Sequence, residues 1–177
     1  SVADDFAAYR RADGLTVEIA EVEQVYNEFS GGVPDMRAVR DYFRFLYDRG
    51  RIDERPLRYA LLLGDGHFDF RSITDDPDSP LNPNWIFPYQ TDETLNRGQS
   101  YTSDDYFGLL DADEGEWTWT GDASTTFERV DIGVGRIPVE TVEEARCPAP
   151  ARAWRMPVTI RPRTTPGSRK RTSDLAG

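Results

Sequence analysis

An unbroken apolar run, Tyr59–Leu63, and the loop that follows it constrain the fold of this 177-residue chain more than any other stretch. The run is short and free of proline, which predicts a strand buried on both faces, as in a parallel sheet. Ligands of open parallel sheets bind beyond the carboxyl ends of the strands. The loop Gly64–Asp69 places two glycines, two aspartates and His67, the only histidine, at that position. These residues fit both a working site and an ordinary glycine-rich turn.

Hydrophobic periodicity before this run predicts alternating helices and strands. We expect a helix over Ala3–Ala12 and a strand over Leu15–Ile19. The segment Glu21–Phe29 is ambiguous, although its apolar side chains have helical spacing. The order of helix, strand, helix and strand implies parallel strands joined by helical crossovers.

The clearest predicted helix begins at Pro34-Asp35, with Asp35 as its N-cap, and ends at Gly50. Its apolar side chains form one broad face. The polar side chains are expected to lie largely away from that face; they are Arg37, Arg40, Asp41, Arg44 and Asp48.

The chain after Asp69 predicts shorter elements. Residues Ser72–Arg97 are predicted to form a long loop. Within it, the aromatic residues Trp85, Phe87 and Tyr89 occupy every second position, which is typical of a short strand. We also expect a hairpin with arms at Tyr106–Leu110 and Trp117–Thr120 and a turn at Asp111–Gly115. A further strand is predicted over Val130–Val134, and a capping box at Thr141–Glu144 begins a helix.

The composition changes abruptly after Arg146. Residues 147–177 contain seven basic residues and one acidic residue, with five of the chain's twelve prolines and no hydrophobic period. We therefore predict a domain over residues 1–146 and a disordered tail over 147–177, which we interpret as a frameshifted or chimeric end.

The other 146 residues carry 14 basic and 31 acidic side chains, a net charge of −17. Such a body disfavours nucleic acid as a partner because phosphate is repelled. It suits high-salt surroundings, divalent cations or basic peptides, and we favour salt adaptation as the hypothesis. No apolar run approaches the ~18 residues of a membrane span. The single cysteine, Cys147, excludes an internal disulfide.

Four carboxylates are candidates for a calcium site. Asp65 and Asp69 follow the central strand, and Asp104 and Asp105 are expected to converge near the same sheet edge. The alternative is that they are solvated acidic loops of an acidic protein. Asp111-x-Asp113-x-Gly115 resembles a calcium loop only superficially, and a hairpin turn is favoured there.

Cysteine–histidine chemistry has little support from the residues alone. His67 could act as a general base or as a ligand, but no second histidine completes a zinc site. Cys147 lies among prolines, and the chain has no Gly-x-Ser-x-Gly nucleophile elbow. The sequence also leaves open a weaker hypothesis, metal-dependent hydrolysis through Asp65 and Asp69.

Several ordered segments together resemble the gingipain-type cysteine peptidases, with the closest likeness to the sortase of type IX secretion. The resemblance covers about residues 3–146. The segments are Tyr26–Gly31 with Pro34-Asp35 and Ala38–Arg40, then Tyr59–Asp69, then Thr102–Tyr106 with Leu110-Asp111, then Ile132–Val139 with Glu144-Ala145.

This resemblance implies a caspase-like, three-layer α/β fold with a mainly parallel sheet and flanking helices. It also implies a polypeptide substrate, a location at the cell surface or outside the cell, and a Cys–His dyad in the second half of the domain. That half contains a Gly-His-Gly segment, which is absent here, so neither His67 nor Cys147 takes a catalytic role. We expect an incomplete and inactive domain; the alternative is a non-catalytic calcium- or protein-binding module.

Overall fold

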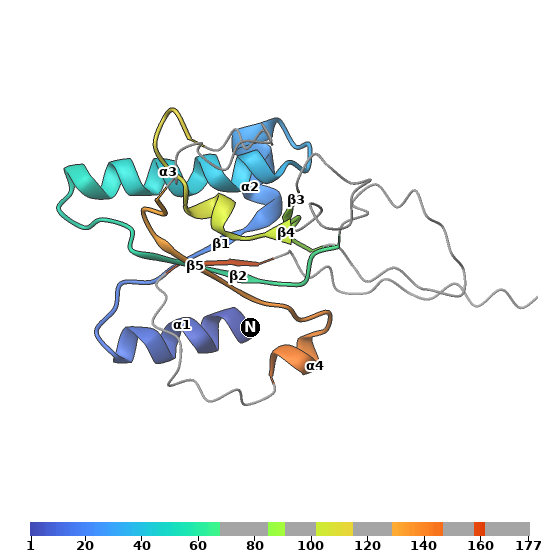
Figure 1. Cartoon of the computed structure of the whole chain (residues 1–177). Coiled ribbons are helices and arrows are strands. Elements are labelled where there is room, and N and C mark those ends of the chain that lie inside the picture. The colour runs from blue at the N-terminus through green and yellow to red at the C-terminus, as the bar shows by residue number, and fades with distance from the viewer. Residues whose placement is uncertain (68–84, 91–101, 115–128, 147–157, 162–177) are drawn as a thin grey trace, which may run out of the picture.

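The computed structural model of the chain describes residues 1–67, 85–90, 102–114, 129–146 and 158–161. A parallel sheet of four strands forms the middle layer of this part (Figure 1). Helices cover both of its faces, so the described residues form three layers (Figure 1). The predicted α/β fold with a parallel sheet and flanking helices is therefore confirmed, as a small and incomplete domain.

The sheet has the strand order β1-β6-β2-β5. Its strands are β1 (Glu18–Glu21), β2 (Tyr59–Leu63), β5 (Gly133–Ile137) and β6 (Val158–Arg161). The helices α2 (Val22–Ser30) and α3 (Met36–Ile52) and the 3-10 helix η1 (Asp105–Gly108) cover one face, and α1 (Val2–Ala12) and α4 (Val142–Ala145) cover the other (Figure 1). The strands β3 (Tyr89–Gln90) and β4 (Thr102–Ser103) form a separate antiparallel pair.

The strand β2 is central, as its apolar run predicts. It pairs in parallel with β6 on one side and β5 on the other. Ala60, Leu61 and Leu62 are at most 1% exposed, because helices pack on both faces of the sheet. Burial is complete only for these three residues, since Tyr59 is 36% exposed where the strand begins.

The helix α3 packs its apolar face on the sheet and begins as predicted. The backbone N–H of Arg37 donates to Asp35 Oδ1 over 2.9 Å, so Asp35 is the N-cap. Two predictions for this helix are wrong. The helix continues past Gly50 to Ile52, and Arg40, expected on the solvent side, is only 8% exposed.

Gly50 is a packing residue inside α3 and does not end the helix. A Cβ atom placed there would lie 2.4 Å from the carbonyl oxygen of Arg55 and 3.0 Å from Cα of Pro56. The chain therefore turns back against the helix at a distance that only glycine allows.

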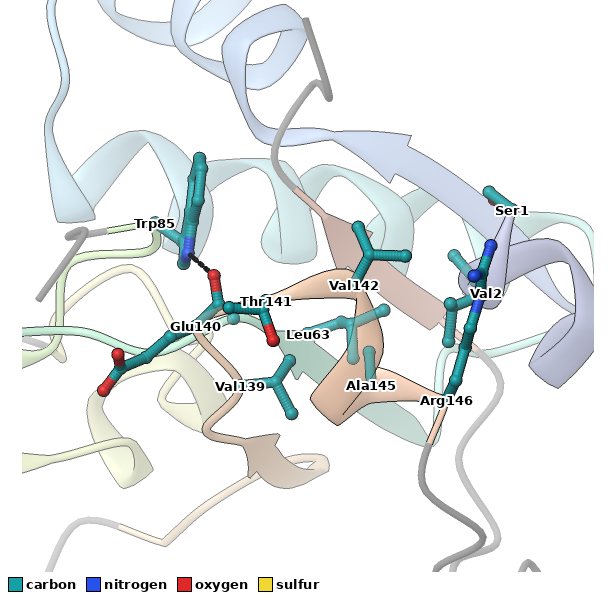
Figure 2. A pocket seen from close by; sticks show the side chains of 12 residues that line it. Ser1, Val2, Leu63, Trp85, Val139, Glu140, Thr141, Val142, Ala145 and Arg146 are labelled. Atoms are coloured by element: carbon teal, nitrogen blue, oxygen red, sulfur yellow. Dashed lines mark hydrogen bonds between the residues drawn. The ribbon is translucent and has the colours of Figure 1, made fainter. Parts of the chain in front are cut away.

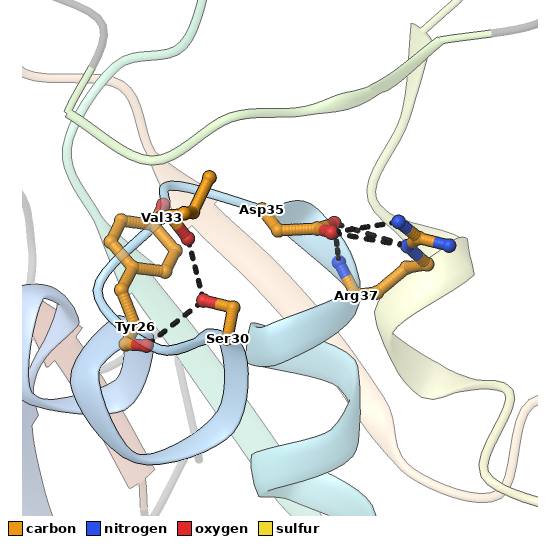
Figure 3. Close-up of polar contacts among 5 residues, drawn as sticks. All are labelled: Tyr26, Ser30, Val33, Asp35 and Arg37. Carbon is orange, nitrogen blue, oxygen red and sulfur yellow. Dashed lines mark hydrogen bonds and ion pairs between the residues drawn. The ribbon is translucent and has the colours of Figure 1, made fainter.

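A compact turn joins α2 to α3 (Figure 3). Ser30 Oγ lies 2.9 Å from the carbonyl oxygen of Tyr26 and 2.5 Å from that of Val33, so its single proton serves one acceptor at a time. Gly31, in the left-handed region at φ 63°, ends α2. The ambiguous segment before this turn is thus a helix, and the turn fixes the start of α3.

Several later elements differ from expectation. Tyr106–Leu110, predicted as a hairpin arm, does not form a strand, and its first three residues belong to η1. The backbone N–H groups of Phe107 and Leu109 donate to the carbonyls of Asp104 and Tyr106, three residues earlier, and so close 3-10 turns in place of strand pairing. The other arm, Trp117–Thr120, lies outside the described residues. Of Trp85, Phe87 and Tyr89, which were predicted to alternate in a short strand, only Tyr89 lies in one, because β3 spans just Tyr89–Gln90.

The strand β6 lies in the segment that was predicted to be disordered. It pairs in parallel with β1 and with β2 and so joins two strands that do not contact each other in the sheet. The sheet therefore extends past the predicted boundary at Arg146. The remaining residues of the predicted tail lie outside the described part.

The helices of the described part include none that is both long and apolar enough to cross a membrane.

Candidate functional site at the carboxyl edge of the sheet

The loop after β2 is held by backbone hydrogen bonds from two directions. The N–H of Gly64 donates to the carbonyl of Ile137 over 3.0 Å, and the N–H of Asp65 donates to Val139 over 3.1 Å. The carbonyl of Asp65 accepts from Trp85 N–H at 3.0 Å and from Ile86 N–H at 3.2 Å. The loop is therefore fixed against β5 and residues 85–86.

Arg136, on β5, is the central polar side chain of this edge. Its Nη1 donates to the carbonyl of Gly64 over 3.0 Å and to that of Ile86 over 2.9 Å. Its Nε and Nη2 donate to the two carboxylate oxygens of Asp104 over 2.9 and 2.7 Å. The Arg136 side chain is 11% exposed, and such a bidentate pair is both strong and directional.

Gly66 is required by the same close packing. A Cβ atom at this position would lie 2.4 Å from the carbonyl oxygen of Ile86 and 3.3 Å from Arg136 Nη1. The Gly-Asp-Gly sequence is thus explained by tight packing at the edge, with the Asp65 carboxylate accepting from Gly66 N–H over 2.8 Å.

The predicted calcium residues are placed apart or already engaged. Asp104 gives both oxygens to Arg136, and Asp105 is exposed at the start of η1. Asp65, Asp104 and Asp105 do not form a group of close carboxylates, and Asp69 lies outside the described residues. Because Asp69 is not described, the four-residue calcium site stays a prediction.

One group of three close carboxylates does occur within the described ranges. Ligand atoms of Asp111, Glu114 and Asp131 lie within 4.8 Å of one another. Asp111 and Glu114 of this group lie in the loop after η1, where the sequence predicted a hairpin turn. Exposed acidic groups of this kind are common without a metal ion.

A cavity of about 290 Å³ lies on the face of the sheet covered by α1 and α4. Its wall is mainly apolar, and Figure 2 shows the apolar side chains gathered between Trp85 and Arg146. The indole Nε1 of Trp85 donates to the carbonyl of Glu140 over 3.2 Å, which fixes one wall. Leu63 and Gly64 line the cavity at the end of β2, so it opens at the predicted edge.

Aromatic side chains complete the opposite side of the edge. Tyr26 stacks on Phe87 with ring centroids 6.2 Å apart, and Tyr89 stacks on Tyr106 at 4.8 Å. Burial, with a smaller effect of Glu23, raises the pKa of Tyr26. Burial likewise raises the pKa of Tyr106. Both phenols are therefore neutral at physiological pH and act as packing groups.

No Cys–His pair is assembled in the part of the chain that the structure describes. His67 is half-buried at the end of the loop, whereas Cys147 lies outside the described residues. The expectation that neither residue takes a catalytic role therefore stays a prediction.

The sequence reasoning missed the importance of Arg136 and Arg40. Arg136 belongs to a segment that carried the family resemblance, but nothing in its local pattern shows which carbonyls it reaches. For Arg40, a signal was present: it lies four residues after Met36 and three before Phe43, next to the buried stripe of α3.

The described residues thus form an α/β domain with a parallel sheet. The carboxyl edge of this sheet carries the packed Gly-Asp-Gly loop and the Arg136–Asp104 pair. The model of peptidase family C25 matches residues 1–147 of the chain. The chain therefore belongs to peptidase family C25, the gingipain family, as the resemblance predicted. No curated protein and no solved structure matches the chain.

Proposed function

We propose that residues 1–146 are the N-terminal subdomain of a gingipain-like cysteine endopeptidase. The match to the family model over residues 1–147 carries this proposal. The role of the subdomain is to scaffold a polypeptide-cleaving site whose Cys–His half this sequence does not contain. A further part of the proposal is processing of sorting signals in type IX secretion.

The chemical requirements of peptide-bond cleavage support the proposal that this chain is inactive. A thiolate nucleophile requires a base within hydrogen-bond reach and donors for the oxyanion. His67 is held in the loop after β2, eighty residues before Cys147, which is flanked by Pro148. The polar groups of the sheet edge are bonded to one another through Arg136 and Asp104, which supports a scaffolding role for this edge.

A panel of fluorogenic peptides tests this proposal. The panel contains arginine, lysine and sorting-signal peptides, and the purified chain is expected to cleave none of them above background. Cys147→Ala and His67→Ala are the matched controls. Turnover that disappears in either variant would show that a working dyad exists within these residues.

The abrupt change of composition after Arg146 supports a second part of the proposal, a change of reading frame at that position. The match to the family model ends at Cys147, close to this change. Sequencing the DNA across the position tests it. An open frame that encodes the same tail, with the mass of the purified protein in agreement, would contradict it.

The alternative, a calcium-binding module, is tested separately by titration calorimetry. If calcium binds at the carboxyl edge, the heat must disappear when Asp65 and Asp69 are both changed to asparagine. Asp104→Asn is a poor probe of calcium binding because it also breaks the pair with Arg136.

A further inference from the structure

Arg40 is a buried cation that faces the loop after η1. Its Nε donates to the carbonyl of Leu109, and its Nη2 donates to the carbonyls of Asp111 and Glu114 over 3.0 and 2.8 Å. The guanidinium carbon lies 5.9 Å from the centroid of the Tyr106 ring. A buried charge is costly unless hydrogen bonds compensate it, and these three carbonyls supply that compensation.

The loop that surrounds Arg40 is acidic and internally bonded. Glu114 Oε2 accepts from the N–H of Asp111 over 3.1 Å, and Asp131 Oδ2 accepts from the N–H of Leu110 over 3.0 Å. These carboxylates and that of Asp111 lie within 4.8 Å of one another. Three like charges this close destabilise a loop unless a cation is near.

Loops that bind calcium meet the same requirement with a metal ion, which carbonyl and carboxylate oxygens surround. A guanidinium can replace the ion, since it carries a permanent charge and five donors in a fixed fork. We propose that Arg40 is the built-in cation of the loop Leu109–Glu114, which folds around the guanidinium and needs no divalent ion.

This arrangement also joins separate layers of the fold. Arg40 belongs to α3, whereas Asp131 immediately precedes Ile132 and the strand β5. The N–H of Asp131 donates to the carbonyl of Gly108 over 2.8 Å, at the end of η1. The loop that Arg40 holds is therefore bonded, through Leu110 and Gly108, to the chain that enters β5.

Hydrogen exchange of the full chain, read by mass spectrometry on peptides that cover residues 108–114, tests the proposal. The wild type is compared with Arg40→Met, Arg40→Lys and a control on the same helix, Arg44→Met, whose side chain is 37% exposed. Each protein is measured in EDTA and in millimolar calcium chloride.

We expect Arg40→Met to speed exchange of this segment at least about tenfold and to lower Tm by about 5–10 °C. Arg40→Lys should also speed exchange, because one ammonium group cannot reproduce the fork. Arg44→Met should leave the segment unchanged, and calcium should leave the wild-type segment unchanged.

Two results would overturn the proposal. One is protection of residues 108–114 in the wild type that increases with calcium. The other is exchange in the Arg40 variants as slow as in Arg44→Met. If Arg40→Met does not fold, Arg40→Lys alone decides between these outcomes.

Discussion

At the scale of single residues, arginine side chains organise this molecule more than its carboxylates do. Arg136 joins β5, the Gly64 carbonyl, the Ile86 carbonyl and Asp104, and Arg40 holds another loop by its carbonyls. Both are largely withdrawn from solvent. In a chain with a formal charge of −11, these buried cations explain how acidic loops can pack against the domain.

Arg136→Met should lower the free energy of unfolding by about 2–3 kcal/mol, because it leaves two carbonyls and one carboxylate without a donor. Asp104→Asn should cost less, since the amide keeps one acceptor. Urea unfolding of both single variants and the double variant measures their coupling. Strictly additive losses would show that the pair does not act as a unit.

Asp35 predicts a specific dependence of stability on pH. Its partial burial tends to raise the pKa of the carboxyl, but hydrogen bonds from the side chain and backbone of Arg37 outweigh this and lower the pKa (Figure 3). The stabilisation is thus present above the ordinary value of 3.8 and is lost as pH falls through the folded-state pKa.

Asp35→Asn keeps the cap but removes the charge, and Asp35→Ala removes both. Urea unfolding at pH 6 and pH 3 should show the wild type more stable than Asp35→Asn at pH 6, with a smaller difference at pH 3. Asp35→Ala should lose about 1 kcal/mol more at both values. A gap between wild type and Asp35→Asn that widens in acid would contradict this assignment.

At the scale of helices and strands, packing against a neighbouring segment of the chain overrides the conformational preference of the local sequence. The helix α3 continues through Gly50, although glycine favours helix termini, because Arg55 and Pro56 pass directly over it. Tyr106, Phe107 and Gly108 belong to η1, where the local pattern suggested a strand. In both places the neighbouring chain determines the local conformation.

Gly50→Ala separates these two influences. Helix propensity alone predicts a gain of about 0.5–1 kcal/mol, whereas the close contact with the Arg55 carbonyl predicts a loss of about 1–3 kcal/mol. We expect the loss. Thermal unfolding beside Asp41→Ala, an exposed control in the same helix, measures it; a stabilised Gly50→Ala protein would mean that the return of the chain adapts freely.

At the scale of the whole molecule, the sheet depends on a strand from far along the chain. The strand β6 lies between β1 and β2 and pairs with both. Without it, β1 has no neighbouring strand among those described. The acidic charge acts at the same scale, because repulsion among distant carboxylates opposes the compact state.

Truncation tests the role of β6. A chain that ends at Arg146 should unfold without a cooperative transition, because the centre of the sheet loses a strand, whereas a chain that ends at Pro162 should unfold cooperatively. Circular dichroism during heating distinguishes them. Equal cooperativity of the two chains would place β6 outside the structural core.

Salt should stabilise the whole chain if its acidity is an adaptation to salt. Potassium chloride at molar concentration should raise Tm by several degrees over low salt, because it screens repulsion among carboxylates. A triple variant, Glu28→Gln with Asp41→Asn and Asp53→Asn, removes exposed charges and should show a smaller rise. A wild-type Tm that does not depend on chloride would remove the hypothesis.

The sequence by itself determined several of the local elements and the family. The apolar run of β2, the stripe and N-cap of α3 and the segments typical of the C25 peptidases are all local patterns, readable because burial imposes a period and caps require particular side chains. It also placed the loop that begins at Gly64 and includes Asp65 and His67 at the carboxyl edge of the sheet, since that edge follows from the direction of β2.

Only the tertiary structure decided which distant groups meet. Arg136 reaches carbonyls 50 and 72 residues earlier in the chain, and Arg40 reaches carbonyls up to 74 residues later. Nothing in the local spacing of either residue encodes those contacts. The strand β6 is a further example. Its four residues become a strand because they pair with β1 on one side and β2 on the other. Without those neighbours its backbone N–H and C=O groups would have no strand partner.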